Sequence, residues 1–458
     1  MLHPRFLITF VIAFALPGTL AAAEKQWLAG VAKVNITPEL PIWLSGYASR
    51  DRPAATTHDE LWAKALVIED AAGKRAVLVT MDLVGIDREL SQTVCKRIEE
   101  TYKLPRSAIA LSTSHTHSGP VIRGNLVPMF ALDADQTRRV KEYKLKLAKK
   151  LVDVVGEAVK SLKPATLAWG IGEAGFAVNR RTNQEGQVAE LRHEDKLIEP
   201  IDHELPVLTV MGDNHKLKAI VAGYACHATV LSDYFISADW PGAAQSEIER
   251  RHPGVTALYF LGCGGDQNPL PRRSVALMKK YGDEFADGVD ATLKSPLKPI
   301  APTLATAYEE IDLPFGELPA RAELELAAEK GEKPQAPWAK FLMREWDRDG
   351  KLQATYPYPV QAWKLGDDLT WIFLGGEVVV DYSLRLKTEL GPGKTWVASY
   401  SNDVMGYIPS RRVLGEGGYE GGLARYPYGL PAPWDATVET LIIDKVHELA
   451  TAVSNDKK

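Results

Sequence analysis

The order of apolar runs along the chain constrains its fold more than any other feature of the sequence. Short runs rich in β-branched residues, typical of buried strands, alternate with longer amphipathic runs, typical of helices that cover a sheet. We expect strands at residues 63–69, 76–82, 108–114, 206–211, 218–226, 257–262 and 369–374. We expect helices at residues 88–102, 136–162, 243–251 and 274–295, the last with Ser274 as its N-cap. This alternation predicts an α/β or mixed α+β fold, with mixed β-sheets packed together and flanked by helices.

The first 23 residues have the pattern of a secretory signal peptide. A short basic start is followed by an apolar stretch at residues 6–20 and by three alanines before Glu24. The apolar stretch is shorter than the roughly 20 residues that a membrane-spanning helix needs, and no later segment is long enough. We therefore predict a secreted or periplasmic chain that begins at Glu24 and has no stable membrane span. An uncleaved N-terminal anchor is the alternative.

Residues 24–458 are long enough for one large domain or two ordinary ones and for a well-buried core. The net charge of -5, without a long basic run, gives no reason to expect a nucleic acid as partner. Residues 314–351 are charged, rich in alanine and glutamate and bounded by proline, which predicts a helical insertion or lid on the surface of one domain. The three cysteines cannot all pair within one chain. Cys226 and Cys263 either pair with each other or stay as buried thiols.

Two histidines follow one of the predicted strands, at residues 111–120, which read Leu-Ser-Thr-Ser-His-Thr-His-Ser-Gly-Pro. Residues one apart on a strand point the same way, so His115 and His117 could both reach one cavity while Thr116 faces the other side. Neutral imidazole is a common ligand of zinc. On these residues alone, a zinc site and a pair of hydrogen-bonded histidines at a strand end are both open.

Three further predicted strands end in residues that could bind a metal or a ligand. His227 closes the strand at 218–226, a glycine cluster and Asp266 follow the strand at 257–262, and Glu377 follows the strand at 369–374. Histidines and carboxylates that gather where several strands stop are typical of a catalytic zinc site. The pattern therefore favours a metal-dependent enzyme.

With these segments, the His-Thr-His-Ser-Gly-Pro motif at residues 115–120 resembles the catalytic domain of the neutral/alkaline, non-lysosomal ceramidases, which are zinc-dependent amidases of N-acylsphingosine. The resemblance continues at residues 31–38, 44–48 and 179–181 and covers scattered motifs from Gly30 to Gly422. It implies a single hydrolase domain over residues 24–458.

The resemblance also implies roles for particular side chains. The zinc ligands would be His115, His227, Glu377 and Tyr407, and His117 would carry the proton from water to the leaving group. Tyr419, a second active-site tyrosine, and Arg180 would stabilise the oxyanion. Candidate substrate-binding residues are Arg180, Asp266 and Asn268, and the carboxylates of Asp239 and Asp266 are candidates to orient the ligand imidazoles. His58 and Asp82 would orient neighbours. From chemistry alone, Tyr407 and Tyr419 could instead be half-buried aromatics that satisfy backbone groups.

The chain departs from the family pattern in two places. Residues 265–269 read Gly-Asp-Gln-Asn-Pro, so Asn268 stands where the family carries a serine that is sometimes proposed as a nucleophile. An amide side chain cannot accept an acyl group, so we expect either attack by metal-activated water or a different reaction. The chain also stops soon after these motifs, without room for the family's C-terminal β-sandwich domain, which counts against lipid engagement and against ceramide itself.

The resulting hypothesis is an exported hydrolase with Zn²⁺ as cofactor, which cleaves the amide bond of ceramide or a related N-acyl compound with metal-activated water. Its partner would be a small-molecule or lipid-like N-acyl substrate. One alternative is an esterase or glycan-directed hydrolase on the same zinc site, which Asn268 and the eleven tryptophans favour. The other is a non-catalytic binding protein, which an intact set of metal ligands disfavours.

Overall fold

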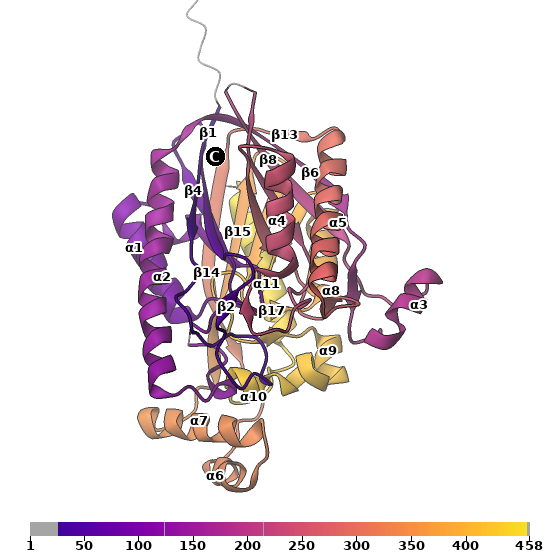
Figure 1. Ribbon diagram of the computed structural model, residues 1–458. Coiled ribbons are helices and arrows are strands. Elements are labelled where there is room, and N and C mark those ends of the chain that lie inside the picture. Colours follow the sequence, from indigo (N-terminus) through magenta and orange to yellow (C-terminus); the bar gives the residue numbers. More distant parts are fainter. Residues whose placement is uncertain (1–25, 123, 214, 456–458) are drawn as a thin grey trace, which may run out of the picture.

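Two β-sheets lie face to face between layers of helices in the computed structural model (Figure 1). It describes residues 26–122, 124–213 and 215–455, so the predicted signal peptide at residues 1–23 lies outside the described residues. The larger sheet has the order β11-β9-β8-β6-β1-β3-β4-β5, and β13 pairs with β6. Its strands are β1 (Trp27–Asn35), β3 (Trp62–Glu69), β4 (Arg75–Met81), β5 (Ile109–Thr113), β6 (Lys163–Glu173), β8 (Glu204–Gly212), β9 (Leu217–Tyr224), β11 (Thr256–Leu261) and β13 (Lys298–Ile300).

The smaller sheet packs on one face of the larger one through large aromatic side chains. Its strands, in spatial order, are β14 (Leu304–Pro314), β15 (Thr355–Leu365), β16 (Leu369–Leu374) and β18 (Thr395–Ala398). Trp363, Trp371 and Trp396 of this sheet are buried against Phe260 and Trp169 of the larger sheet. These tryptophans serve the core, where burying such side chains strongly stabilises a fold, and they give no support to a glycan-directed site.

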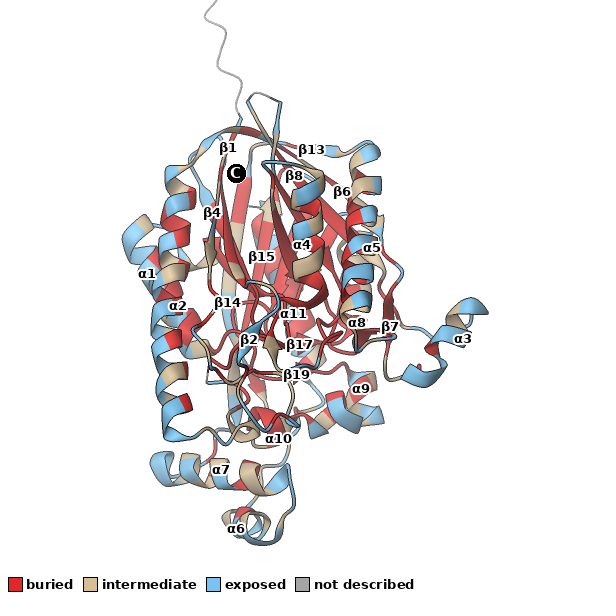
Figure 2. Cartoon of the chain, viewed as in Figure 1, coloured by how far each residue is buried: buried red, intermediate tan, exposed pale blue. Residues whose placement is uncertain are grey.

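Helices cover the outer faces of both sheets, with buried residues on the side that faces the sheet and exposed residues on the outer side (Figure 2). On the larger sheet lie α1 (Arg88–Tyr102), α2 (Ala134–Lys160), α4 (Asp239–Arg251) and α5 (Val275–Lys294). The smaller sheet is covered by α8 (Val380–Leu390) and α11 (Val438–Asn455). Away from the sheets are α3 (Val188–His193), α6 (Arg321–Lys330), α7 (Gln335–Asp349), α9 (Arg411–Glu416) and α10 (Arg425–Tyr428).

The fold class and the order of elements predicted from the sequence are confirmed. All seven predicted strands and four predicted helices are present, with ends that differ by at most four residues. Local chemistry explains the sharp helix starts: the Ser274 side chain accepts a hydrogen bond from the Leu277 N–H, as predicted, and Asp87 and Asp133 cap α1 and α2 in the same way.

Several strands were not predicted, chiefly β1, β6, β14 and β15. The residues of β1, β6 and β14 are half-buried or exposed at many positions, as at Lys33 in β1 and at Glu309 and Glu310 in β14. β15 is buried at most positions, but it contains Pro357 and Pro359, and proline is unusual within a strand. A strand with one solvated face shows no continuous apolar run, so tertiary pairing decides that it forms a strand.

The predicted insertion at residues 314–351 is helical. It forms α6 and α7, which lie at one end of the molecule beside α10 (Figure 1). Trp338 of α7 anchors it, because its indole Nε1–H donates to Leu430 O at 2.8 Å and its ring meets the Tyr426 ring edge-on. The possible lid function stays a prediction.

The larger sheet is strongly coiled. β11 and β5 stand at opposite ends of the strand order, yet β11 contacts both β4 and β5. Such coiling follows from the right-handed twist of strands, which accumulates over neighbouring pairs. It brings the loops after β5, β9 and β11 to one place. The three cysteines of the described chain are all free and buried, so Cys226 and Cys263 do not pair.

The buried carboxyl group of Asp82, directly after β4, should make the stability of the protein depend on pH. Its Oδ2 accepts the Trp62 N–H at 2.9 Å, and burial raises the carboxyl pKa to about 6. The folded chain therefore keeps a proton that the unfolded chain releases near pH 4, so the stabilisation it brings is complete below pH 4 and is lost as the pH rises through about 6.

We expect the free energy of unfolding of the wild type to fall relative to that of Asp82→Asn by up to about 3 kcal/mol between pH 4 and pH 7. Urea denaturation across this pH range measures the difference. Asp368→Asn, at an exposed carboxylate that pairs with Lys394, should follow the wild-type curve. Parallel curves for the wild type and Asp82→Asn would refute the prediction.

Candidate metal centre

His115 and His117 lie just after β5 rather than on it. The strand ends at Thr113, and His115 has a φ of 59°, in the left-handed region. The two histidines are therefore not on a strand, contrary to the prediction, but their side chains do point the same way: the two rings are 4.7 Å apart between centroids, and the Thr116 hydroxyl points away to donate to Ser237 O. A tight turn, not the pleat, turns both imidazoles inward.

Backbone carbonyls hold the imidazoles of His115 and His227 through Nδ1. His115 Nδ1 bonds to Val84 O, and His227 Nδ1, just beyond β9, bonds to Gly264 O at 2.6 Å. A carbonyl can only accept, so each Nδ1 carries the proton and each Nε2 presents a lone pair. The prediction that Asp239 and Asp266 orient these rings is wrong, because backbone carbonyls do so.

Glu377 and Tyr407 reach the same point from two short paired strands. They lie opposite each other in the parallel pair formed by β17 (Glu377–Val378) and β19 (Tyr407–Ile408). Glu377 Oε2 is 3.1 Å from the Nε2 atoms of both His115 and His227, and the Tyr407 hydroxyl is 3.2 Å from His227 Nε2. The four predicted ligand residues, which span almost 300 positions of sequence, are thus joined by a chain of direct contacts.

The donor set fits a metal ion. Two imidazole Nε2 lone pairs, one carboxylate oxygen and one phenol oxygen converge, and such an excess of acceptors calls for a cation between them. The Nε2 atom of His117 adds a further nitrogen, 3.0 Å from His115 Nε2. Among the described residues, His115, His117 and His227 form a group whose ligand atoms all lie within 4.8 Å of one another. Nitrogen and oxygen donors of this kind suit zinc.

His115, His117, His227, Glu377 and Tyr407 form what we call the centre, whose electrostatics favour neutral imidazoles at His117 and His227 beside an ionised Glu377 carboxylate. Burial lowers the pKa of His227 to about 4 and holds the pKa of His117 well below its usual value. Burial alone would raise the pKa of Glu377, but the adjacent His115 and His227 lower it well below that of a free glutamate. These are the protonation states in which such groups bind metals.

Two tyrosines that sequence reasoning missed hold the Glu377 carboxylate. The Tyr428 hydroxyl, in α10, donates to Oε1, and the Tyr400 hydroxyl donates to Oε2 at 3.3 Å. Carboxylates that bind metals are commonly held in this way. The sequence carried one weak signal, the Tyr-Pro-Tyr segment at residues 426–428, but nothing in it linked that segment to Glu377.

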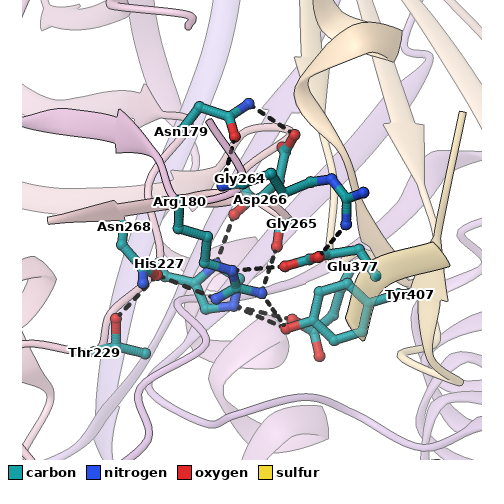
Figure 3. Close-up of polar contacts among 12 residues, drawn as sticks. Asn179, Arg180, His227, Thr229, Gly264, Gly265, Asp266, Asn268, Glu377 and Tyr407 are labelled. Carbon is teal, nitrogen blue, oxygen red and sulfur yellow. Dashed lines mark hydrogen bonds and ion pairs between the residues drawn. The ribbon is translucent and has the colours of Figure 1, made fainter. Parts of the chain in front are cut away.

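Arg180 joins the centre to the glycine-rich segment (Figure 3). Its guanidinium donates to the Tyr407 hydroxyl at 3.0 Å, to Gly265 O at 2.9 Å, to Asn268 Oδ1 at 3.2 Å and to Glu420 Oε1 at 2.7 Å. Burial opposes the charged form, but Tyr407 and Glu420 raise the Arg180 pKa well above its usual value. The group is therefore a fixed cation beside the centre.

The two other predicted substrate-binding residues differ in position. Asn268 lies next to Arg180, and its Oδ1 also accepts from the Thr229 hydroxyl at 3.4 Å. Asp266 is fully buried, and its oxygens accept from the Val380 N–H and from the Asn179 side chain. These contacts assign Asp266 to positioning two paired segments, residues 177–180 with Arg180 and residues 267–269 with Asn268, and substrate binding by Asp266 stays a prediction.

The glycines of this segment allow close approach of backbone to backbone. A Cβ on Gly265 would lie 2.7 Å from Glu377 O, and one on Gly264 would lie 2.9 Å from Cys226 N. Gly265 N–H also donates to Val378 O at 2.9 Å. The glycine-rich segment after β11 thus packs against the backbone at Glu377 on one side and against the backbone next to His227 on the other.

Tyr419 stands at the outer edge of the centre. It belongs to a π-helical turn (Tyr419–Leu423), is 44% exposed, and its ring centroid is 5.3 Å from that of Tyr407. A cavity of about 460 Å³ opens beside it, lined also by Arg180 and Asn268. A larger cavity of about 790 Å³ lies past Tyr428, between α7 and the start of α1. A molecule at the centre could extend past Arg180 and Tyr419.

Three residues of the segment after β1 hold His117. Tyr47 packs on its ring at 4.8 Å, Arg50 donates to its carbonyl at 2.7 Å, and Gly46 lies directly against the ring. A Cβ at Gly46 would lie 2.5 Å from His117 Cγ, and the residue has a φ of 93°. The shape of this turn therefore sets where the His117 imidazole lies.

Gly46→Ala should displace the His117 ring and reduce kcat roughly 100-fold, because misplacing a catalytic group by about 1 Å can cost that much. The matched control is Gly73→Ala, where φ is 81° but no atom lies within 4 Å of the added methyl group. Both variants should lose about 1 kcal/mol of stability to backbone strain. Equal activity of the two variants would refute the role of Gly46. Kinetics and thermal denaturation measure the two effects.

Comparison with known proteins gives this arrangement a family. Residues 27–267, which contain all three histidines and Arg180, match the family model for the N-terminal part of neutral/alkaline non-lysosomal ceramidases. The chain belongs to this ceramidase family. The resemblance drawn from the sequence motifs is confirmed. Glu377 and Tyr407 lie beyond the matched residues, yet they contact the matched histidines.

Individual ceramidases are distant relatives of this member of the family. The neutral ceramidase of Pseudomonas aeruginosa is 26% identical over 330 residues, 69% of this chain and 47% of that protein. Neutral ceramidase 1 of Arabidopsis thaliana is 23% identical over 285 residues, 61% of this chain and 36% of that protein. The aligned part therefore spans about half or less of these curated relatives.

The fold is shared with a solved ceramidase. The crystal structure of the neutral ceramidase from Pseudomonas aeruginosa superposes with a TM-score of 0.72 at 19% identity, over 94% of this chain and 75% of that one. Within the residues that the structure describes, none of the helices is both long and apolar enough to cross a bilayer.

Proposed function

We propose that this chain is a zinc-dependent hydrolase that cleaves the amide bond of ceramide or a related N-acyl compound. The single observation that carries the proposal is the convergence of His115, His227, Glu377 and Tyr407 on one point, with their acceptor atoms facing each other. Relatives named neutral ceramidase support the amide as the bond that is cleaved. Their matched length is partial, so the substrate of the whole protein is part of the proposal.

Zinc would be held by His115, His227, Glu377 and Tyr407, and it would supply Lewis acidity toward the scissile carbonyl and the attacking water. His117 lies beside this point, with Nε2 directed at His115 Nε2. A neutral imidazole there can take a proton from the attacking water at Nε2 and return it to the leaving nitrogen. Arg180 and Tyr419 would stabilise the negative charge that develops on the carbonyl oxygen.

Asn268 supports water rather than a side chain as the nucleophile. Its amide lies between Arg180 and Thr229, where a serine nucleophile would have to stand to use the same segment. An amide cannot form an acyl intermediate, whereas it can orient a neighbour or a substrate oxygen. The reaction then consumes one water, breaks the C–N bond and releases a carboxylic acid and an amine.

The proposal extends to the whole chain in three further respects. Residues 1–23 would be a signal peptide, and residues 24–458 would form one hydrolase domain. The mature protein would be secreted or periplasmic. The sequence pattern at residues 1–23 supports export.

The test is a comparison of amide and ester turnover with metal content. The purified chain would be analysed for zinc and assayed, with and without a chelator, on N-acylsphingosine, on other N-acyl compounds and on esters with the same acyl groups. About one zinc per chain and chelator-sensitive amide turnover are expected. Zinc with turnover of esters alone would shift the assignment to an esterase, and a chain without zinc that is still active would overturn the metal assignment.

A further inference from the structure

The cavity of about 460 Å³ beside Arg180 is lined mostly by residues with polar or charged side chains. Of the residues that line it, Arg181, Asn183, Glu185 and Arg272 present charged or amide groups, in addition to Arg180, Asn268 and Glu420. Apolar surface comes from Leu270 and from the ring of Tyr419. Because Arg180 and Asn268 border both this cavity and the centre, whatever projects from the scissile bond in this direction meets these walls.

The arginines on these walls are matched by carboxylates. Arg272 contacts Glu185 with Nε and Nη2 at 2.9 to 3.2 Å, and Arg181 contacts Glu416 at 3.0 Å and Glu420 at 2.6 Å. Glu420 also pairs with Arg180. Three arginines and two glutamates therefore line the cavity, and Glu416 pairs with Arg181 from outside it, so each arginine already has a carboxylate partner and the net positive charge is small.

Guanidinium donors and carboxylate acceptors that lie side by side on the cavity wall suit the hydroxyl groups of a bound molecule. A hydroxyl can accept from a guanidinium and donate to the neighbouring carboxylate, so neighbouring hydroxyls can satisfy an arginine and a glutamate together. An alkyl chain in the same place would remove water from these groups and replace none of their hydrogen bonds, which is unfavourable. The polar part of the walls therefore favours hydroxyl groups over a hydrocarbon chain.

Tyr419 adds a flat face to these polar walls. It is 44% exposed while its neighbour Tyr407 is buried, so its ring lies at the entrance of the cavity. An aromatic ring offers an apolar face to the C–H side of a sugar ring, while the hydroxyl groups at the edge of that sugar reach polar side chains.

We propose that the group on the amide nitrogen is hydroxyl-rich and sugar-like, so that the substrate is an N-acylated amino sugar or amino polyol rather than a two-chain lipid. This inference rests on the proposed amide hydrolysis at the centre and names its substrate class. Water adds a hydroxyl to the acyl carbon and a proton to the nitrogen, and the products are a carboxylic acid and the free amino sugar.

The first experiment compares three substrates with one common acyl group: N-acylglucosamine, N-acylsphingosine and an N-acyl anilide without hydroxyls. We expect kcat/KM for the amino sugar to exceed that for the sphingosine compound at least about 10-fold, as a pair of hydrogen bonds to charged groups allows. A preference for N-acylsphingosine would overturn the substrate class. Failure of all three, the anilide included, would count against the hydrolase proposal.

The second experiment uses Arg272→Ala, which removes the arginine of the Arg272–Glu185 pair and leaves Glu185 exposed to solvent. KM for N-acylglucosamine should rise about 10-fold with kcat unchanged, and the anilide should be unaffected. The matched control is Arg138→Ala, which breaks an Arg–Glu pair on the surface of α2. An equal effect of Arg272→Ala on all substrates would indicate a structural role and overturn the assignment.

Calorimetry separates this inference from the activity itself. Glucosamine and N-acylglucosamine would be titrated into wild type and Arg272→Ala, whether or not either is turned over. Binding to the wild type that weakens about 10-fold in the variant is expected. No binding of either sugar to the wild type would refute the sugar-binding cavity even if amide hydrolysis is found.

Discussion

His227→Ala is expected to remove bound zinc and to lower amide turnover roughly 1,000-fold or more, since metal catalysis supplies several kcal/mol of transition-state stabilisation. The substitution deletes the Nε2 atom that lies 3.1 Å from Glu377 Oε2 and 3.2 Å from the Tyr407 hydroxyl. It also leaves Gly264 O without its imidazole partner. Elemental analysis and steady-state kinetics on the same preparation give the two quantities.

The matched control is His447→Ala, because His447 is half-exposed on α11 and pairs with Glu389 at 2.6 Å far from the centre. That variant should keep full zinc and full activity. Circular dichroism would confirm that His227→Ala is folded, and His115→Ala should reproduce its metal loss. A folded His227→Ala variant that retains stoichiometric zinc would show that the ion is held elsewhere.

Tyr419→Phe is expected to keep zinc and to lose about 100-fold in kcat, close to the effect of removing one oxyanion donor in comparable sites. Tyr419 is more exposed than the other tyrosines beside the centre, at 44%, whereas Tyr407 and Tyr428 are buried. The ring stays in place in the variant, so packing on Tyr407 at 5.3 Å is preserved. KM should change little, because the interaction forms chiefly in the transition state.

Tyr308→Phe is the control for loss of a tyrosine hydroxyl, since Tyr308 donates to Glu310 on the exposed part of β14. It should leave kcat, KM and zinc content unchanged. If Tyr419→Phe raises KM with kcat intact, Tyr419 binds the substrate without stabilising the transition state. If the variant loses zinc, the π-helical turn at residues 419–423 supports the metal ligands instead.

The sequence by itself was sufficient for the class of fold and for much of its element order. The strands that were predicted correctly are buried on both faces and read as continuous apolar runs, as in β16, which is buried at all six positions. Capping residues such as Asp87 and Ser274 marked helix starts because their side-chain bonds are local. The strands that were missed, such as β1 and β14, have solvated positions, and only pairing with neighbouring strands defines them.

The candidate site divides in the same way. The His-Thr-His motif and the strand-end residues His227 and Glu377 could be singled out from their type and place in the sequence. Local sequence did not reveal that His115 would sit in a left-handed turn, or that backbone carbonyls at Val84 and Gly264 would orient the rings. Those partners carry no side-chain signature, because any residue offers a carbonyl.

The amino-acid sequence therefore determined which chemical groups are present at the ends of the strands, and which family they belong to. Only the tertiary structure decided that they meet. Coiling of the larger sheet brings β11 against β5, and the pairing of β17 with β19 sets Glu377 beside Tyr407. The arginine and glutamate pairs of the cavity wall likewise join residues 87 positions apart, as in Glu185 and Arg272. Such contacts depend on accumulated twist and packing over the whole sheet, which no local pattern of residues encodes.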